Sequence, residues 1–367
     1  MNLSVGEPHF QPPPAVIKSL HTAIDEMKLD YTSVRGTVEF RETIAEYMTK
    51  SLGHRDVTAD HVLTTTGAKF AIWLALSALL ESGSEVIVIK PYWTSYPEIV
   101  KINGGTPVFV DSDKDTGELP VENIINAVTS RTKAIIVCNP NNPSGVVYSK
   151  KALTRLAKEI DSDKRFADIW IISDEIYERL DFVNEFMSFA TLPNMSKRTI
   201  TINGFSKGYG MTGLRLGWLT GPKHVISAAA TMQSQTTHAP CSLSQEAGIS
   251  ALRSDIKTMT TFYDETKQRR DVVVNIIRSK LTKNQVRFAP PNGALYIFID
   301  VEPVLTKGRK IEDLCLFLME KHGVCVVPGS AFGVDTGLRI AYCKRSLDRL
   351  KSGITRFCDG LLAFESS

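Results

Sequence analysis

The chain has 367 residues, a formal net charge of +3 and an ordinary globular composition, with 43% hydrophobic and 23% charged residues. A chain of this length forms one large core or two unequal domains. Because the net charge is small and no block of lysine or arginine stands out, the composition gives no reason to expect nucleic acid or an anionic membrane as a partner.

The six cysteines are scattered without a CxxC spacing, and several lie in apolar runs such as IIVCNP. A reduced cysteine in such a run behaves as a small hydrophobe, so we expect a reducing, cytoplasmic compartment and no metal site. No apolar run reaches about 18 residues and no export signal begins the chain, so neither a membrane span nor secretion is indicated.

The chain opens with a short β-like run that ends at Gly6 and a proline cluster, where prolines exclude a helix. Because this run begins almost at residue 1, we expect an upstream segment to be missing. Apolar periodicity then predicts helices at residues 15–27, 38–52, 70–80, 150–160, 254–277 and 311–321, with a further helix at the end of the chain. Apolar runs predict strands at residues 61–65, 85–89, 106–110, 134–138, 168–173, 199–202, 218–220, 286–288, 293–300 and 324–327.

Strands and helices alternate from about residue 31 to 230, which predicts an α/β fold. A second module of βαβ type is expected in the remainder, from residue 286 onward. Several polar features follow the carboxyl ends of predicted strands, which is the edge where open α/β sheets bind ligands.

Three of these features are ambiguous when taken singly. The strand, glycine turn and helix around TTTGAK (64–69) point free backbone N–H groups at an anion, although many such turns bind nothing. The aromatic residues of PYWTSYP (91–97) form either a stacking surface for a ring or a cap on the core. Asp174, directly after a buried strand, either caps a helix or faces a cationic ligand atom.

Two cations stand out in NGFSKGYGMTGLRLG (203–217), where Lys207 lies among small residues and Arg215 follows in a second glycine-rich turn. This stretch is either a surface loop or a place where something flat approaches the lysine amine. Asn142 is held rigidly by the prolines of NPNNPSG at the end of another strand. Arg339, in an apolar strand, needs an anion, which is a ligand or an internal acid.

Taken in order, five segments resemble the fold-type I pyridoxal-phosphate aminotransferases, specifically the bacterial and archaeal aspartate aminotransferase branch. The segments are PYWTSYPEIV, NPNNPSG, SDEIY, NGFSKGYGMTGLRLGW and VPGSAFG…LRIAY. The resemblance extends from GEPHF, beginning at Gly6, to the terminal helix. It implies a large cofactor-binding domain at residues 31–277, with a mostly parallel central sheet flanked by helices. It also implies a smaller α+β domain formed by residues 1–30 and 278–367.

The resemblance assigns the ring of pyridoxal 5′-phosphate to five residues. Lys207 matches the lysine that forms the Schiff base, and Asp174 matches the acid that keeps the ring nitrogen protonated. Asn142 and Tyr177 match the donors to the phenolic oxygen, and Trp93 matches the aromatic residue that stacks on the ring.

The phosphate of the cofactor is assigned in the same way. Arg215, Ser206 and the backbone N–H groups of Ala68 and Lys69 match its donors. Tyr31 matches a residue that reaches the phosphate of the neighbouring subunit, so the resemblance implies a homodimer with shared active sites.

The resemblance further implies a ping-pong transamination, in which the substrate is an L-amino acid and then a 2-oxo acid and Lys207 carries the proton between Cα and the cofactor. Arg339 matches the bidentate grip on the α-carboxylate, assisted by the Gly6 backbone, and Trp93 and Asn142 match further contacts with the substrate.

Aspartate or glutamate, with oxaloacetate or 2-oxoglutarate, is the first expectation for the substrate pair. It rests on the branch and on Lys69, which matches a lysine for the distal carboxylate but also lies beside the phosphate turn. Tyrosine, phenylalanine, alanine and kynurenine stay open as donors, as does a β-lyase on the same fold. A non-enzymatic binding protein is disfavoured because the catalytic set is intact. Gly204 departs from the pattern, since other branches place a phosphate-binding serine there.

Overall fold

A seven-stranded sheet in the order β1-β7-β6-β5-β4-β2-β3 dominates the computed structural model, which describes residues 1–254, 256–306, 308–344 and 346–366. Its strands are β1 (Val62–Thr65), β2 (Glu85–Lys90), β3 (Thr106–Asp111), β4 (Thr132–Cys138), β5 (Trp170–Asp174), β6 (Thr199–Gly204) and β7 (Gly217–Thr220). β7 runs antiparallel to both of its neighbours, β1 and β6, and the other neighbouring pairs are parallel. The predicted α/β class with a mostly parallel sheet is therefore confirmed.

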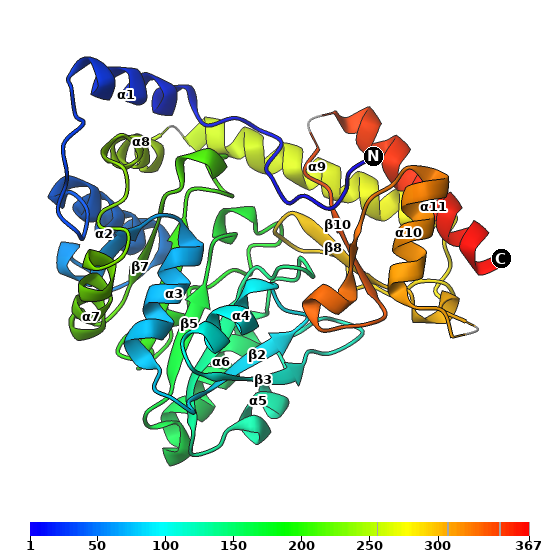
Figure 1. The fold of residues 1–367 in the computed structure, drawn as a ribbon, viewed down its shortest axis with the longest axis horizontal. Helices are drawn as coiled ribbons and strands as arrows, with labels where there is room; N and C mark the ends of the chain where they lie inside the picture. The colour runs from blue at the N-terminus through cyan, green and yellow to red at the C-terminus, as the bar shows by residue number, and fades with distance from the viewer. Residues whose placement is uncertain (255, 307, 345, 367) are drawn as a thin grey trace.

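Helices cover both faces of this sheet (Figure 1). The helices of the chain are α1 (Pro14–Asp25), α2 (Val38–Leu52), α3 (Ala68–Leu79), α4 (Ser95–Ile102), α5 (Val121–Ala127), α6 (Lys150–Ser162), α7 (Lys223–Ser234), α8 (Ser242–Leu252), α9 (Ile256–Lys280), α10 (Ile311–His322) and α11 (Leu347–Ser366). Alternate residues of β4 enter different apolar cores, because successive side chains of a strand point to opposite faces. Ile135 and Val137 pack with α5 and α6, whereas Ile136 packs with α3, α4 and α7. Burial on both faces explains why this strand reads as one continuous apolar run.

A second sheet has the order β8-β10-β9 and is antiparallel throughout. Its strands are β8 (Tyr296–Asp300), β9 (Val327–Pro328) and β10 (Gly337–Ala341). The predicted succession of strand, helix and strand is present, but β10 lies between β8 and β9 and separates them. The strand predicted at residues 286–288 is wrong. Only Arg287 makes an isolated bridge there, and the apolar run instead reflects burial of Val286 in the core of this sheet.

The first residues of the chain belong to this second sheet and then cross to the other end of the molecule. The Leu3 N–H donates to the Cys325 carbonyl at 2.8 Å, and the Leu3 carbonyl accepts from the Ala341 N–H at 2.8 Å. From there the segment passes beside α9, where the Phe10 and Phe262 rings stack at 4.3 Å between centroids, and continues into α1 (Figure 1). The N-terminal segment therefore joins the second sheet to α9 and α1.

The sequence predicted the bounds of some elements accurately and missed others. α2 occupies the predicted residues 38–52, begins after the Thr37 N-cap and ends at Gly53 in the left-handed conformation. α4 was missed because Pro97 suggested a turn, yet a proline is tolerated in the first turn of a helix. The predicted helix at 254–277 includes residue 255, which lies outside the described residues. The division into domains at residues 31–277 stays a prediction.

A buried acid, Glu175, directly follows β5. Its Oε1 atom accepts hydrogen bonds from Ser173 Oγ at 2.7 Å, Ser188 Oγ at 2.8 Å and the Phe189 N–H at 3.2 Å. The same Ser188 hydroxyl contacts His54 Nε2 at 2.8 Å. Burial raises the pKa of Glu175 from 4.5 to about 8, although these hydrogen bonds oppose the shift.

This carboxyl predicts a pH-dependent difference in stability between the protein and its Glu175→Gln variant. The folded protein retains a proton that the unfolded chain releases between pH 4.5 and about 8, so the contribution of Glu175 to stability falls as the pH rises through that window. A glutamine carries no such proton. We expect the two proteins to be about equally stable at pH 5 and the variant to be more stable at pH 8 by about 1–3 kcal/mol.

Urea denaturation at both pH values measures this difference. The His54 imidazole is present in both proteins, so its titration cancels. The same stability difference at both pH values would contradict the assignment of a protonated Glu175.

Candidate active site

The antiparallel direction of β7 places two cations at one edge of the large sheet. β6 ends at Gly204 and β7 begins at Gly217, and the two residues pair directly with each other. The loop that joins them therefore starts and finishes at the carboxyl edge of the parallel strands. This geometry brings both Lys207 and Arg215 to the edge where such sheets bind ligands.

A cavity of about 330 Å³ lies at this edge, between the large sheet and residues of the second sheet. Eleven of the twelve predicted site residues line it: Gly6, Ala68, Lys69, Trp93, Asn142, Asp174, Tyr177, Ser206, Lys207, Arg215 and Arg339. Tyr31 is the exception, because it lies in the segment between α1 and α2 with 95% of its surface exposed.

Asp174, the last residue of β5, is a buried carboxyl that lines the cavity. Its Oδ2 atom accepts from the Tyr96 hydroxyl at 2.6 Å, and its Oδ1 atom accepts from the Ile176 N–H at 3.3 Å. Burial raises the pKa of Asp174 to about 6, against the opposite effect of these two hydrogen bonds. A cationic group in the cavity would stabilise the ionised form.

Lys207 extends its amine toward the N-terminal segment, where Nζ donates to the Gly6 carbonyl at 2.7 Å. Burial lowers the pKa of this amine, and the charges of Arg339 and Arg215 act in the same direction. A lowered pKa increases the fraction of neutral amine, which is the nucleophilic form.

An anion cradle is formed by Arg215 and the start of α3. The first N–H groups of a helix, here those of Ala68 and Lys69, have no acceptor within the helix and point outward. Arg215 adopts the left-handed conformation with φ of 49°, which is uncommon for a residue with a side chain, and its Nη1 atom donates to the Thr212 carbonyl at 2.9 Å. A Cβ atom added to Gly67 would lie 2.8 Å from Arg215 Nη2, so glycine leaves room for the guanidinium.

The structure also explains Gly204, where the sequence lacks a serine. A Cβ atom at this position would lie 3.0 Å from Gly217 Cα and 3.0 Å from the Leu216 carbonyl oxygen. β6 and β7 approach too closely here for a side chain to fit without movement of the backbone.

Arg339 of β10 is held between two aromatic rings, 4.5 Å from the centroid of Tyr296 and 4.9 Å from that of Phe332. Its Nη2 atom donates to the Ser4 carbonyl at 2.7 Å, and Nη1 donates to Asn142 Oδ1 at 3.2 Å. Within the described residues Arg339 makes no ion pair with an acid, and its buried Nε atom has no partner. The alternative of an internal acidic partner is therefore not supported, and an anionic ligand fits better.

Two tyrosines that the sequence did not assign complete the cavity. The Tyr296 hydroxyl contacts the Tyr177 hydroxyl at 3.0 Å, and the Tyr96 ring packs edge-on against Trp93 at 5.3 Å between centroids. Lys69 Nζ lies 5.1 Å from the centroid of the Trp93 ring. Tyr96 belongs to the aromatic segment that drew attention in the sequence, but Tyr296 lies in an ordinary strand and carried no signal.

Neither metal nor membrane features accompany this site. In the part of the chain that the structure describes, no group of three or more histidine, cysteine, aspartate or glutamate side chains is arranged to hold a metal ion. None of the described helices combines the length and the apolar character needed to cross a membrane.

Comparison with known proteins gives a consistent result across the whole chain. The family model for aminotransferase class I and II matches residues 1–357. The chain belongs to this aminotransferase family. An aspartate/prephenate aminotransferase of Cereibacter sphaeroides is 37% identical over 373 residues, which cover 98% of this chain and 92% of the relative. An aspartate aminotransferase of Rhizobium meliloti is 35% identical, with 96% of this chain and 88% of the relative covered.

Solved aminotransferase structures have the same fold. The aspartate aminotransferase of Thermus thermophilus with maleate has a TM-score of 0.90 and 33% identity, covering 98% of this chain and 91% of the other. The aspartate aminotransferase of Rhizobium meliloti has a TM-score of 0.92 and 34% identity, with the same coverage. The predicted family and fold type are therefore confirmed.

Aminotransferases of this family use pyridoxal 5′-phosphate. The cavity offers suitable groups for its aldehyde, its ring nitrogen and its phosphate. The aldehyde requires an amine, which Lys207 offers with a lowered pKa. The ring nitrogen requires an acid, which the buried Asp174 offers without an ion pair in the described chain. The phosphate requires donors, which the Arg215 cradle offers. The residues present therefore fit the cofactor.

The cradle predicts that Gly67→Ala weakens cofactor binding. Gly67 has φ of +93°, which side chains rarely adopt, and the added methyl group would displace the Arg215 guanidinium. We expect the dissociation constant for pyridoxal 5′-phosphate to rise about 10–100-fold. Equilibrium dialysis with the cofactor measures this constant.

The matched control is Gly213→Ala in the loop that carries Arg215, since a Cβ atom there would meet no atom within 4 Å. We expect its affinity to stay within about twofold of the unsubstituted protein. Equal losses in both variants would show that the clearance at Gly67 is not the cause.

Proposed function

We propose that this protein transfers the amino group between aspartate or glutamate and a 2-oxo acid, with pyridoxal 5′-phosphate as cofactor. The observation that carries the proposal is the convergence of Lys207, Asp174, Arg215 and Arg339 on one cavity. Relatives named aspartate aminotransferase match nearly the full chain and support the choice of substrate.

In this proposal five side chains hold the cofactor ring. Asp174 pairs with the ring nitrogen, Asn142 and Tyr177 donate to the phenolic oxygen, Trp93 stacks on the ring and Lys207 binds the aldehyde carbon. All five line the same cavity, which supports these roles. The buried carboxyl of Asp174 gains most, because a protonated ring nitrogen would offset the cost of its ionisation.

The phosphate is held by Arg215, Ser206 and the first N–H groups of α3, from Ala68 and Lys69. A dianion at this position meets a guanidinium, a hydroxyl and the positive end of a helix, which together favour its charge.

When bound, the cofactor serves as an electron sink for the pair left on the substrate Cα as its proton is removed. Lys207 performs the proton transfer, since its lowered pKa favours the neutral amine that accepts the Cα proton. The Gly6 carbonyl, at 2.7 Å from Nζ, is placed to orient that amine.

Arg339 binds the α-carboxylate of the substrate as a two-pronged donor. The Nη atoms of Arg339 donate to the Ser4 carbonyl and to Asn142 Oδ1, and a substrate carboxylate would replace these neutral acceptors with a charged one. Lys69, beside Trp93 in the same cavity, is the group we assign to the distal carboxylate of aspartate or glutamate.

The shared active site extends the proposal to a cytoplasmic homodimer. Tyr31 is exposed and does not line the cavity of its own chain, so we assign its hydroxyl to the cofactor phosphate of the partner subunit. Large apolar side chains are also exposed near it, on α1, on the segment after α1 and at the start of α2; they are Ile17, Ile24, Met27, Leu29 and Val38. Such a face supports burial against a second copy.

All six cysteines are free thiols, in keeping with a reducing compartment.

Transamination predicts a defined product balance. With aspartate and 2-oxoglutarate, the protein loaded with cofactor should form glutamate and oxaloacetate in equal amounts. Lys207→Ala should lower the rate by at least about a thousandfold, because the group that moves the proton is lost. Coupled assays for each product measure the balance. With cysteine as donor, whose Cβ carries a leaving thiol, release of sulfide, ammonia and pyruvate without glutamate formation would instead identify a β-lyase. Faster turnover of tyrosine or kynurenine than of aspartate would change the assigned donor.

Lys69 gives a separate test of the substrate class. We expect Lys69→Met to lower kcat/KM for aspartate about 10–100-fold, because a charge-assisted hydrogen bond is lost. For alanine, which has no distal carboxylate, the change should be within about twofold. Steady-state kinetics with both donors measure the ratio. A parallel fall for both donors, with weaker cofactor affinity, would place Lys69 at the phosphate instead.

A further inference from the structure

The segment between α1 and α2 combines an exposed tip with firmly held flanks. Tyr31 is 95% exposed, and its ring lies tilted against that of His238, at 5.6 Å between centroids. Residues on both sides of it are nevertheless tied to α7, α8 and β1. A loop tip of this kind is usually mobile. The hydrogen bonds that hold the residues on either side of Tyr31 therefore need an explanation.

The strongest of these ties is the side chain of Gln245, which lies on α8 and is fully buried. Its Oε1 atom accepts from the Thr37 N–H at 2.8 Å. Its Nε2 atom donates to Thr32 Oγ1 at 2.9 Å and to the Pro240 carbonyl at 2.8 Å. Both amide hydrogens and the amide oxygen are therefore used, and two of the three contacts hold the segment on either side of residues 33–36.

A second buried amide supports the same segment. Gln233 of α7 donates through Nε2 to the Val34 carbonyl at 2.7 Å and to the Thr64 carbonyl at 2.9 Å. Thr64 belongs to β1, so this amide joins the segment to the large sheet. Hydrogen bonds of buried amides are costly to lose, because each group left without a partner retains the penalty of its desolvation.

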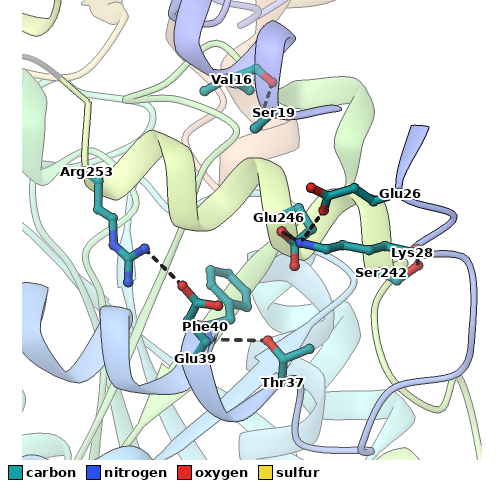
Figure 2. Close-up of polar contacts among 10 residues, drawn as sticks. All are labelled: Val16, Ser19, Glu26, Lys28, Thr37, Glu39, Phe40, Ser242, Glu246 and Arg253. Atoms are coloured by element: carbon teal, nitrogen blue, oxygen red, sulfur yellow. Dashed lines mark hydrogen bonds and ion pairs between the residues drawn. The ribbon is translucent and has the colours of Figure 1, made fainter. Parts of the chain in front are cut away.

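The contacts at the start of the segment are more exposed. Figure 2 shows Lys28 directed at Glu26 and Glu246, with Nζ to carboxylate distances of 3.2 Å and 2.9 Å, and the Ser242 hydroxyl donates to the Lys28 carbonyl at 2.8 Å. Ion pairs this exposed contribute little to stability. The position of Tyr31 therefore depends mainly on the buried amides.

We propose that Gln245 is a positioning residue for the cofactor site of the partner subunit. It acts through the segment that carries Tyr31, and the inference rests on the shared active site proposed above. An exposed tyrosine on a free segment would lose conformational entropy when its hydroxyl bound a phosphate across the interface, which would weaken that contact. Gln245 fixes the segment in advance, so the Tyr31 hydroxyl reaches the phosphate with a smaller loss of conformational entropy.

A competing path runs within one subunit. Gln233 and the carbonyl of Arg35 both bond Thr64, and β1 leads to the glycine turn at Gly67. A disturbed segment would in that case alter the cradle of its own chain. In one path the cofactor site of the partner subunit loses affinity for the cofactor, and in the other the site of the same chain does. Mixed dimers distinguish the two paths.

The first experiment compares single variants by their dissociation constants for pyridoxal 5′-phosphate. Bound cofactor is quantified as the group that borohydride reduction fixes to Lys207. We expect Tyr31→Phe to weaken binding about tenfold and Gln245→Met to weaken it about fivefold. No change in Tyr31→Phe would overturn the proposed role of Tyr31 in the shared site. Weakening in Tyr31→Phe but not in Gln245→Met would overturn only the present inference.

The second experiment uses mixed dimers in which one protomer carries Lys207→Ala, so that cofactor can be fixed only in the other protomer. With Gln245→Met on the same protomer as Lys207→Ala, the intact site receives Tyr31 from the disturbed protomer, and we expect about fivefold weaker binding. With the two substitutions on opposite protomers, the intact site receives Tyr31 from an undisturbed protomer, and we expect normal affinity. The opposite pattern, or equal losses in both dimers, would overturn positioning across the interface.

Two further variants control for general damage. Arg253, directly after α8, contacts Glu39 Oε1 of α2 at 3.0 Å (Figure 2) and Thr43 Oγ1 of α2 at 3.1 Å. Arg253→Ala removes these two polar contacts without touching the segment and should leave cofactor affinity unchanged. Thr32→Val removes only the hydroxyl that Gln245 holds. If Gln245→Met fails to fold, Thr32→Val in the same mixed dimers must show a smaller loss with the same pattern, and an unchanged affinity would overturn the proposal.

Discussion

The burial of the Asp174 carboxyl constrains the whole site. A carboxyl at the end of β5 is enclosed by apolar cores, and its hydrogen-bond donors are one tyrosine hydroxyl and one backbone N–H. Its ionised form is costly in that setting unless a cation comes close. Tyr96 can donate to it because α4 begins shortly after β2, at Ser95, and places the Tyr96 ring in the buried interior. A cationic ring beside Asp174 would therefore offset the cost of burying the ionised carboxyl.

The N-terminal segment is the second determinant, because two of its carbonyl groups hold the two key cations. Ser4 accepts from Arg339 and Gly6 accepts from Lys207, with both distances at 2.7 Å. The same segment is fixed to the second sheet through Leu3. In the proposed role, a substrate would compete with the Ser4 carbonyl and Asn142 Oδ1 for Arg339. This favours a ligand that brings a full negative charge over one that brings only a dipole.

Much of the fold and of the cavity could be predicted from the sequence, because the relevant signals are local. Apolar runs marked the buried strands, and polar residues after them marked the ligand edge. The order β8-β10-β9 could not be predicted, since the insertion of β10 between the other two strands depends on contacts across the chain. Tyr296 escaped notice for a related reason. The Tyr296 hydroxyl contacts that of Tyr177 only because the fold brings β8 close to the residues that follow β5, which are distant from β8 in the sequence.

Other features could not be decided from local pattern. The helix α4 was not predicted because Pro97 suggested a turn. A proline interrupts the interior of a helix but is tolerated in its first turn, where Pro97 lies. The sequence left open whether an acid or a ligand is the partner of Arg339, and only the structure, where Arg339 forms no ion pair with an acid among the described residues, narrowed that choice. The role proposed for Tyr31 requires a second copy of the chain, so neither the sequence pattern nor the structure of a single chain determines it.

The reversal of direction at β7 has a mechanical consequence. Lys207 and Arg215 lie on one short connection whose two ends are paired to each other at Gly204 and Gly217. Arg339 lies on a different sheet. A shift of one sheet relative to the other would change the separation between Arg339 and Lys207 while leaving that between Lys207 and Arg215 nearly constant. With the roles proposed above, such a shift would accommodate substrates of different length without changing the spacing of the two groups assigned to the cofactor.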